Sequence, residues 1–427
     1  MATGIPAVLQ ASSSSAGARP LSIALAGIAA LAAAMGVGRF AFTPLLPMML
    51  HDGVVDIAAG SWLATANYLG YLAGAVLYTA LPWLGVRTAQ AGVNAALVRG
   101  GLVATVLLTL AMAAPGPALW PWWRLLAGVA SAQVLLGASN WCMGQLAQRG
   151  ASALGGVIFV GPGLGIVLTG LSASGMVALH WSAATGWAVF GVMALALCAL
   201  AWPLLKSAPA PAAAASAQAA APVQGALTSV AQRTLLAAAY GLAGLGYIVT
   251  ATFLPVIARA ALPAGSVWSD LFWPIFGAGV VLGAVLSTRI HPSRDRRWLL
   301  AWLYLAQAAA IAIGMAWPTR TGFALGSLLL GLPFTAITFF ALQEARRQWP
   351  GAGAAFTGLL TALYGLGQIA GPPMAAWLLA HAASRAQGFD WALGVAAGAL
   401  ALGAAVYAGM AWRWPFTRFQ TKSASSA

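Results

Sequence analysis

The chain has 427 residues, of which 61% are hydrophobic and only 6% are charged, and its formal net charge is +14. An ordinary soluble domain carries roughly 25% charged residues, so this composition excludes a soluble globular protein. A strongly basic soluble protein would suggest a nucleic-acid partner. Here most of the basic residues fall at the breaks between apolar segments, so they indicate membrane topology and contact with the lipid bilayer, and we expect no nucleic-acid partner.

Twelve apolar segments of membrane-spanning length follow one another with short breaks. The pattern predicts an all-α polytopic membrane protein with twelve transmembrane helices. Several segments exceed the length needed to cross a bilayer, so we expect tilted or bent helices. The predicted segments are 21–49, 59–82, 92–114, 118–147, 151–179, 183–205, 232–258, 268–290, 298–317, 321–343, 352–380 and 388–412.

The first six segments are echoed by the last six at a nearly fixed offset. This internal repeat predicts two pseudo-symmetric six-helix bundles, residues 21–205 and 232–412, an arrangement that suits alternating access to a site between them. The matches are Gly36, Gly38, Leu46 and Pro47 with Gly244, Gly246, Leu254 and Pro255; Gly70 and Gly74 with Gly279 and Gly283; and Gly161 and Pro162 with Gly371 and Pro372.

The remaining segments predict two tails and a linker, all of them cytoplasmic. Residues 1–20 resemble a disordered tail, residues 206–231 are a flexible linker rich in Ala, Pro, Ser and Gln, and residues 413–427 form the second tail. The loops and tails on the same side of the membrane as these segments hold fourteen Lys and Arg residues, and the loops on the opposite side hold three. By the positive-inside rule, both termini are cytoplasmic.

Two strings of residues resemble a known family. Residues 36–40 (Gly-Val-Gly-Arg-Phe) with residues 43–48, and residues 66–74 in the second segment, are similar to the signature of the bacterial YbfB/YjiJ-type members of the major facilitator superfamily. The resemblance covers the whole chain. It implies two six-helix bundles around a central cavity, lined mainly by the first, fourth, seventh and tenth helices, in the bacterial inner (plasma) membrane.

Wider superfamily patterns are also present. Arg124 and Gly128 resemble the arginine motif of the fourth helix, and Gly161 with Pro162 resembles the Gly-Pro motif that the fifth helix of antiporters carries. The loop after the second helix lacks the acidic residue that the superfamily pattern contains. Residues 289–297, which include Asp295, are therefore the better candidate for a charged cytoplasmic clasp.

Small residues recur four positions apart within several segments. Such pairs place two glycines on one helix face and let neighbouring helices approach closely. Pro162 and Pro372 remove a backbone donor and are expected to bend the fifth and eleventh helices. Packing is the simpler interpretation of these residues, and a gating role through bending is the alternative. The candidate coupling or gating residues are Arg124, Gly128, Gly161, Pro162, Gly371 and Pro372.

Arg39 is the sharpest candidate for a functional residue. It lies about 18 residues into the first segment, well inside the membrane span. A midplane arginine costs about 2.5–3.5 kcal/mol on insertion scales, so its side chain must face water or a partner. An anion such as a carboxylate could bind the guanidinium bidentately. The alternatives are a structural arginine, capped by backbone carbonyls or by Asp52 or Asp56, and a gating role.

Other polar residues in apolar segments complete the candidate substrate cavity. Each prefers a wet cavity or another helix to lipid, and interhelical hydrogen bonding is the more common explanation for any single one. Arg124 has two interpretations, one near the cavity and one with its side chain reaching to the headgroups. The candidate cavity residues are Arg39, Thr43, Asn67, Tyr71, Tyr247, Thr250, Thr335, Thr338, Tyr364 and Gln368.

These observations favour a secondary active transporter of a small organic solute, with an anion as one candidate, that works by alternating access. A proton-coupled multidrug or metabolite efflux antiporter is the alternative, although no midplane carboxylate is present to carry the proton. A non-transporting sensor on the same fold is a second alternative. An enzyme, a metal, a cofactor and ATP are not expected, because no such constellation or nucleotide-binding loop occurs. We expect a monomer.

Overall fold

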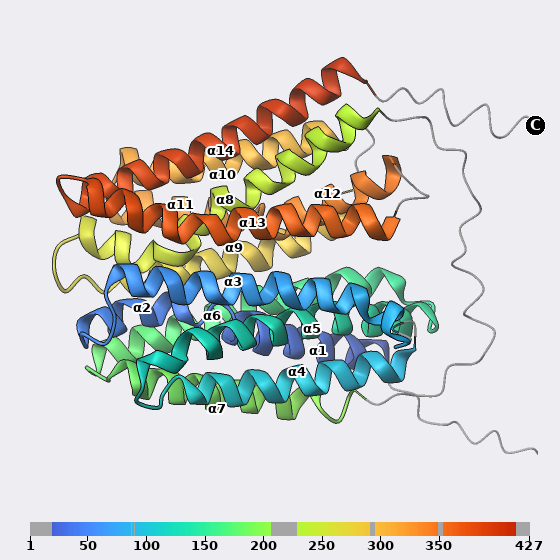
Figure 1. Ribbon diagram of the computed structural model, residues 1–427, viewed down its shortest axis with the longest axis horizontal. Coiled ribbons are helices and arrows are strands. Elements are labelled where there is room, and N and C mark those ends of the chain that lie inside the picture. The colour runs from blue at the N-terminus through green and yellow to red at the C-terminus, as the bar shows by residue number, and fades with distance from the viewer. Residues whose placement is uncertain are drawn as a thin grey trace, which may run out of the picture.

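The computed structural model describes residues 19–86, 88, 90–205, 229–290, 295–348 and 353–415. These residues form helices joined by short connections, and the described ranges contain no strand. The helices α1–α7, blue to green, lie together beside the helices α8–α14, lime to red (Figure 1). Nearly all of the predicted tails and of the predicted linker lies outside the described residues.

The first half of the chain contains seven α-helices and four short helical segments. The α-helices are α1 (Pro20–Leu31), α2 (Phe42–His51), α3 (Ile57–Ala80), α4 (Ala91–Ala111), α5 (Trp120–Ala147), α6 (Val160–Ala178) and α7 (Ala183–Ala201). The short segments are the π-helical η1 (Ala32–Val37) and the 3-10 helices η2 (Leu81–Leu84), η3 (Pro117–Leu119) and η4 (Ser152–Phe159).

The second half follows the same plan. Its helices are α8 (Val230–Ala261), α9 (Trp268–Arg289), α10 (Arg296–Ala316), α11 (Arg320–Gly331), α12 (Phe334–Gln348), α13 (Gly353–His381) and α14 (Arg385–Arg413). Ten helical stretches of the described chain are long and apolar enough to cross a membrane. The helices α3 and α13, of 24 and 29 residues, have membrane-spanning length as well. The two halves meet mainly where α6 packs against α9 and where α3 packs against α13.

The internal repeat reappears in the contacts that the glycines make. A methyl group added at Gly70 of α3 would lie 1.8 Å from the carbonyl oxygen of Leu125, and one added at Gly279 of α9 would lie 2.5 Å from that of Leu328. Helix α3 therefore packs on α5 as α9 packs on α11. The prediction that these glycines let helices approach closely is confirmed, because no side chain fits between the two backbones.

Gly128 belongs to the same set of close contacts. A methyl group on Gly128 would lie 2.1 Å from the carbonyl oxygen of Asn67, and one on Gly331 would lie 2.2 Å from that of Phe276. These two glycines lie at corresponding positions of α5 and α11 and make the same contact in each half. Gly128 thus has a packing role, and Gly331, which the predicted repeat did not match with it, has the same role in the second half.

One of the matches in the predicted repeat is wrong. Pro162 lies in the first turn of α6, directly after the 3-10 segment η4, whereas Pro372 lies in the second half of α13. A proline in a first turn breaks no helical hydrogen bond, so Pro162 does not interrupt α6. Gly161 packs on the backbone of Ile28, and Gly371 packs on the side chain of Ile248. Both glycines allow close packing, but at different heights of their bundles.

Two of the predicted segments are interrupted. The first changes from α1 to the π-helical η1 and then to a turn before α2 begins, with backbone bonds from Gly38 N to Ala33 O of 2.9 Å and from Phe40 N to Met35 O of 3.1 Å. The tenth is divided at Pro333, between α11 and α12. π-Helical turns inside helices are frequent at functional sites, and this one leads directly to Arg39.

The glycine contacts predict how substitutions act on stability. We expect Gly70→Ala and Gly283→Ala to lower the free energy of unfolding by about 1–3 kcal/mol, because the new methyl group overlaps a backbone carbonyl. Gly100→Ala is the matched control, since Gly100 of α4 has no neighbour within 4 Å of its added methyl group. The control should be neutral or stabilising by up to about 1 kcal/mol. Thermal unfolding in detergent measures all three, and equal losses would contradict the packing account.

Candidate functional site

Arg39 lies at the turn between η1 and α2, and its side chain is buried, at 3% exposure. Its Nη2 donates to the Oε1 of Gln368 at 2.5 Å. The Nε2 of Gln368 in turn donates to the hydroxyl oxygen of Tyr247 at 2.7 Å. This chain of hydrogen bonds joins the first half of the protein to α13 and α8 of the second half. The Nε of Arg39 has no hydrogen-bond partner among the described residues.

Aromatic rings surround the guanidinium of Arg39. Its Cζ lies 4.0 Å from the ring centroid of Tyr71 and 5.3 Å from those of Phe40 and Tyr68. The ring of Tyr364 stacks on that of Tyr247 at a centroid distance of 5.9 Å. Ring faces stabilise a desolvated cation, but they supply no negative charge. The site is therefore a buried cation in an aromatic and neutral polar setting.

No carboxylate pairs with Arg39. The chain has six acidic residues, and all six lie in the described ranges. Asp52 accepts from the backbone N of Ala183 at 2.6 Å, and Asp56 accepts from the backbone N of Ala59 at 2.7 Å. The interpretation in which one of these two acids caps Arg39 is therefore wrong. The other four acidic residues are Asp270, which pairs with Arg259; Asp295 and Glu344, which pair with arginines of the second half; and Asp390, which is exposed.

Arg124 lies beside Arg39 and holds its backbone. Its Nη1 and Nη2 donate to the carbonyl oxygens of Gly38 and Arg39, each at 3.1 Å, and the residue is 2% exposed. The carbonyl oxygen of Arg124 accepts from the Nδ2 of Asn67 at 2.9 Å. The interpretation in which Arg124 reaches out to the headgroups is wrong, because the side chain points inward. Arg124 stabilises the turn that presents Arg39.

Cross-half hydrogen bonds close the site on the side of α2. The hydroxyl of Thr43 donates to the carbonyl oxygen of Ala251 at 2.7 Å, and the hydroxyls of Tyr68 and Thr252 lie 3.0 Å apart. Every residue of 42–49 in α2 and of 246–258 in α8 is buried. The helices α2 and α8 are therefore closely packed on this side of Arg39.

The structure brings most of the predicted cavity residues together, but not all. Tyr71, Tyr247, Tyr364 and Gln368 gather around Arg39, as described above. The hydroxyl of Thr338 accepts from that of Tyr240 at 3.2 Å, and Tyr240 stacks on Tyr364 at 4.8 Å. The hydroxyl of Thr335 is buried and has no partner among the described residues. Thr250 instead lines a separate small cavity with Ser327 and Phe323, between α8, α10 and α11.

Sequence reasoning missed three aromatic members of the site. These are Phe40 and Tyr68, whose rings lie near the guanidinium, and Phe334, whose ring lies 6.1 Å from Phe40 and 4.9 Å from Tyr247. Tyr68 could have been found from its position one turn before Tyr71. The position of Phe334 depends on the break at Pro333, which a proline inside the predicted segment 321–343 could have indicated.

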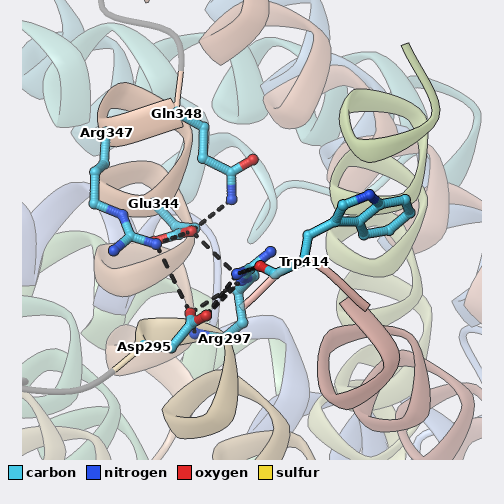
Figure 2. Close-up of polar contacts among 6 residues, drawn as sticks. All are labelled: Asp295, Arg297, Glu344, Arg347, Gln348 and Trp414. Atoms are coloured by element: carbon cyan, nitrogen blue, oxygen red, sulfur yellow. Dashed lines mark hydrogen bonds and ion pairs between the residues drawn. The ribbon is translucent and has the colours of Figure 1, made fainter. Parts of the chain in front are cut away.

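A second polar cluster lies at one end of the second half (Figure 2). The carboxylate of Asp295 binds the Nη2 of Arg297 at 2.5 Å and lies 3.7 Å from that of Arg347. Glu344 accepts from Arg347 at 2.6 Å and from Gln348 at 2.5 Å. Charged groups thus gather around Asp295, as predicted for the cytoplasmic clasp. The ion pairs join the start of α10 to α12, so they lie within one half of the protein.

The end of α14 is part of this cluster. Arg297 also donates to the backbone carbonyl of Trp414, as Figure 2 shows. Burial disfavours the charge of Asp295, but its hydrogen bonds to Arg297 and the nearby charge of Arg347 hold the pKa of this carboxyl below its ordinary value. A lowered pKa means that the stabilisation is present at neutral pH and is lost as the pH falls through the lowered value. The cluster therefore holds α10, α12 and α14 together at neutral pH.

The many membrane-length helices and the buried polar centre define a multi-pass α-helical membrane protein. The model of the family described as "Uncharacterised MFS-type transporter YbfB" matches residues 31–408. The chain belongs to this family of MFS-type transporters, and it is a transporter and not an enzyme.

Similarity to solved structures supports the same fold. The crystal structure of a point mutant of the nucleoside transporter NupG resembles this one with a TM-score of 0.68 at 14% sequence identity, over 91% of this chain and 99% of that one. At that identity the likeness shows the fold alone. A search of curated proteins gives no match.

The polar cluster at α12 predicts the effect of neutralising its buried acid. We expect Glu344→Gln to lower the free energy of unfolding, by up to about 3–5 kcal/mol, because the charges of Arg297 and Arg347 then face Asp295 alone. Asp390→Asn, which alters an exposed carboxylate, is the control. Thermal unfolding of both variants tests this, and an unchanged Glu344→Gln would contradict it.

Proposed function

We propose that the protein is a secondary active transporter that carries a small organic anion by alternating access. Its twelve transmembrane helices, the ten apolar spans together with α3 and α13, would form two six-helix bundles in the bacterial inner membrane with both termini cytoplasmic. The protein would act as a monomer. The observation that carries this proposal is the guanidinium of Arg39, which is buried at the interface of the halves without a carboxylate.

The energetics of burial favour an anionic substrate. A charge held inside a membrane protein requires a partner or water, and a midplane arginine costs about 2.5–3.5 kcal/mol on insertion scales. The side-chain partners of Arg39, Gln368 and Tyr71, are both neutral, and its Nε has no hydrogen-bond partner among the described residues. Arg124 differs from Arg39 because both of its Nη atoms donate to backbone carbonyls, although its Nε, like that of Arg39, has no partner among the described residues. A carboxylate can bind the guanidinium of Arg39 and neutralise its charge.

The positions of the acidic residues argue against proton-coupled drug efflux as the first choice. A proton carrier needs a titratable group near the substrate, and a cationic drug would meet the uncompensated charge of Arg39. Asp270 lies in the first turn of α9 and Glu344 in the last turns of α12, so each lies near an end of its helix. Neither of the two carboxylates pairs with Arg39. A sensor that binds without transport would use the same site, and uptake into vesicles separates the two.

The anion site is tested with a defined probe. We expect benzoate, but not the neutral isostere benzamide, to raise the unfolding temperature of the purified protein, because only the carboxylate neutralises Arg39. Arg39→Lys should weaken the response, since an ammonium keeps the charge but loses the planar fork. Arg39→Ala should abolish the response and the uptake of labelled benzoate into proteoliposomes. Arg320→Ala, which removes an exposed arginine, is the matched control.

Two outcomes would overturn this assignment. One is an Arg39→Ala protein that is folded and still takes up benzoate at the rate of the Arg320→Ala control. The other is a wild-type protein that responds equally to benzoate and benzamide. Binding of benzoate without uptake would instead favour the sensor.

The orientation is tested by labelling single cysteines in a variant whose own Cys142 and Cys198 are replaced by alanine. Ala118 and Gln148 are exposed and lie near opposite ends of α5. An impermeant maleimide added to intact cells should label Ala118→Cys, and it should label Gln148→Cys only after the cells are opened. The reverse pattern would place the termini outside.

A further inference from the structure

Among the described residues, Gln368 is the only side chain of the second half that accepts a hydrogen bond from Arg39. Its amide is buried, at 1% exposure, and both of its ends are engaged: Oε1 with Arg39 and Nε2 with the hydroxyl of Tyr247. Because a guanidinium only donates hydrogen bonds, the amide oxygen is the end that faces Arg39, and the Nε2 faces the hydroxyl of Tyr247. Glutamine is the neutral counterpart of glutamate, so the oxygen on Arg39 has the geometry of a carboxylate oxygen without its charge.

We propose that Gln368 holds the place of the substrate carboxylate on Arg39 and is the residue that makes the site select anions. This inference rests on the proposed function of Arg39 as the anion anchor. A carboxylate carries the opposite charge and has two oxygens that can bind the guanidinium bidentately, whereas the amide offers one neutral oxygen, so a substrate carboxylate displaces the amide. A glutamate at this position would neutralise Arg39 permanently, and the neutral glutamine leaves the charge available.

The exchange also acts on the contact between the halves. Arg39 belongs to the first half, and Gln368 and Tyr247 belong to the second, so the bond from Arg39 to Gln368 holds the halves together at this level. When a substrate takes over the guanidinium, this cross-half bond is broken and the amide is released to a new partner. The substrate thereby changes the balance between conformations, because it binds only the one in which Gln368 has left Arg39.

Two substitutions of similar size test the inference with benzoate as the probe. Gln368→Glu supplies an internal carboxylate, so we expect a higher unfolding temperature without ligand and an affinity for benzoate reduced by at least about tenfold at pH 7.5. Gln368→Met removes the competing acceptor, so we expect benzoate to bind several-fold more tightly. If Gln368 had only a structural role, both variants would lower the unfolding temperature and both would weaken the binding of benzoate.

The outcomes separate this inference from the proposed function. If wild-type protein does not respond to benzoate or to other small carboxylates, the proposed function fails. If wild-type protein binds benzoate and the Gln368→Glu variant binds it equally well, the anchor stands and the inference about Gln368 is overturned. Weaker binding in the Gln368→Met variant overturns it as well, because it would show that the amide assists the anion and does not compete with it.

Discussion

The burial of Arg39 without a carboxylate is the constraint on which the rest of the site depends. Its positive charge is held by a neutral amide, Gln368, and by aromatic faces, of which Tyr71 is the nearest. The backbone around it is shaped for this purpose, because the π-helical η1 and the following turn leave the carbonyls of residues 38 and 39 available to Arg124. Arg124 thus serves as a structural support for Arg39, whose guanidinium we propose as the anion site.

Close packing of helices at glycines is the second feature of the contact between the two halves. In the contact of α6 with α9, a methyl group added at Gly163 would lie 2.9 Å from the carbonyl oxygen of Gly277, and one added at Gly170 would lie 2.6 Å from the ring of Pro274. At both positions the two helices approach closely because glycine carries no side chain. Near Arg39, hydrogen bonds of Thr43, Tyr68 and Gln368 join the two halves of the protein.

The sequence predicted the helices and much of their packing, because hydrophobic length and glycine spacing are local properties. Gly70 and Gly279 show this, since each was matched from sequence and each packs on the helix expected of a repeat. The match of Pro162 with Pro372 failed, because a short Gly-Pro pair recurs without structural equivalence. Arg39 was identified from its depth in an apolar segment, but its bond to Gln368 was not, because a contact across 329 positions depends on tertiary packing. The inward direction of Arg124 depends on free carbonyls at a helix break that hydrophobicity does not reveal.

The most direct test of the central claim is to locate a bound anion. An experimental structure of the protein with 4-bromobenzoate would place the ligand through the anomalous scattering of its bromine. We expect the carboxylate within hydrogen-bond distance of the guanidinium of Arg39, with Gln368 displaced from it. Bromine density elsewhere, with the bond from Arg39 to Gln368 still intact, would contradict the account.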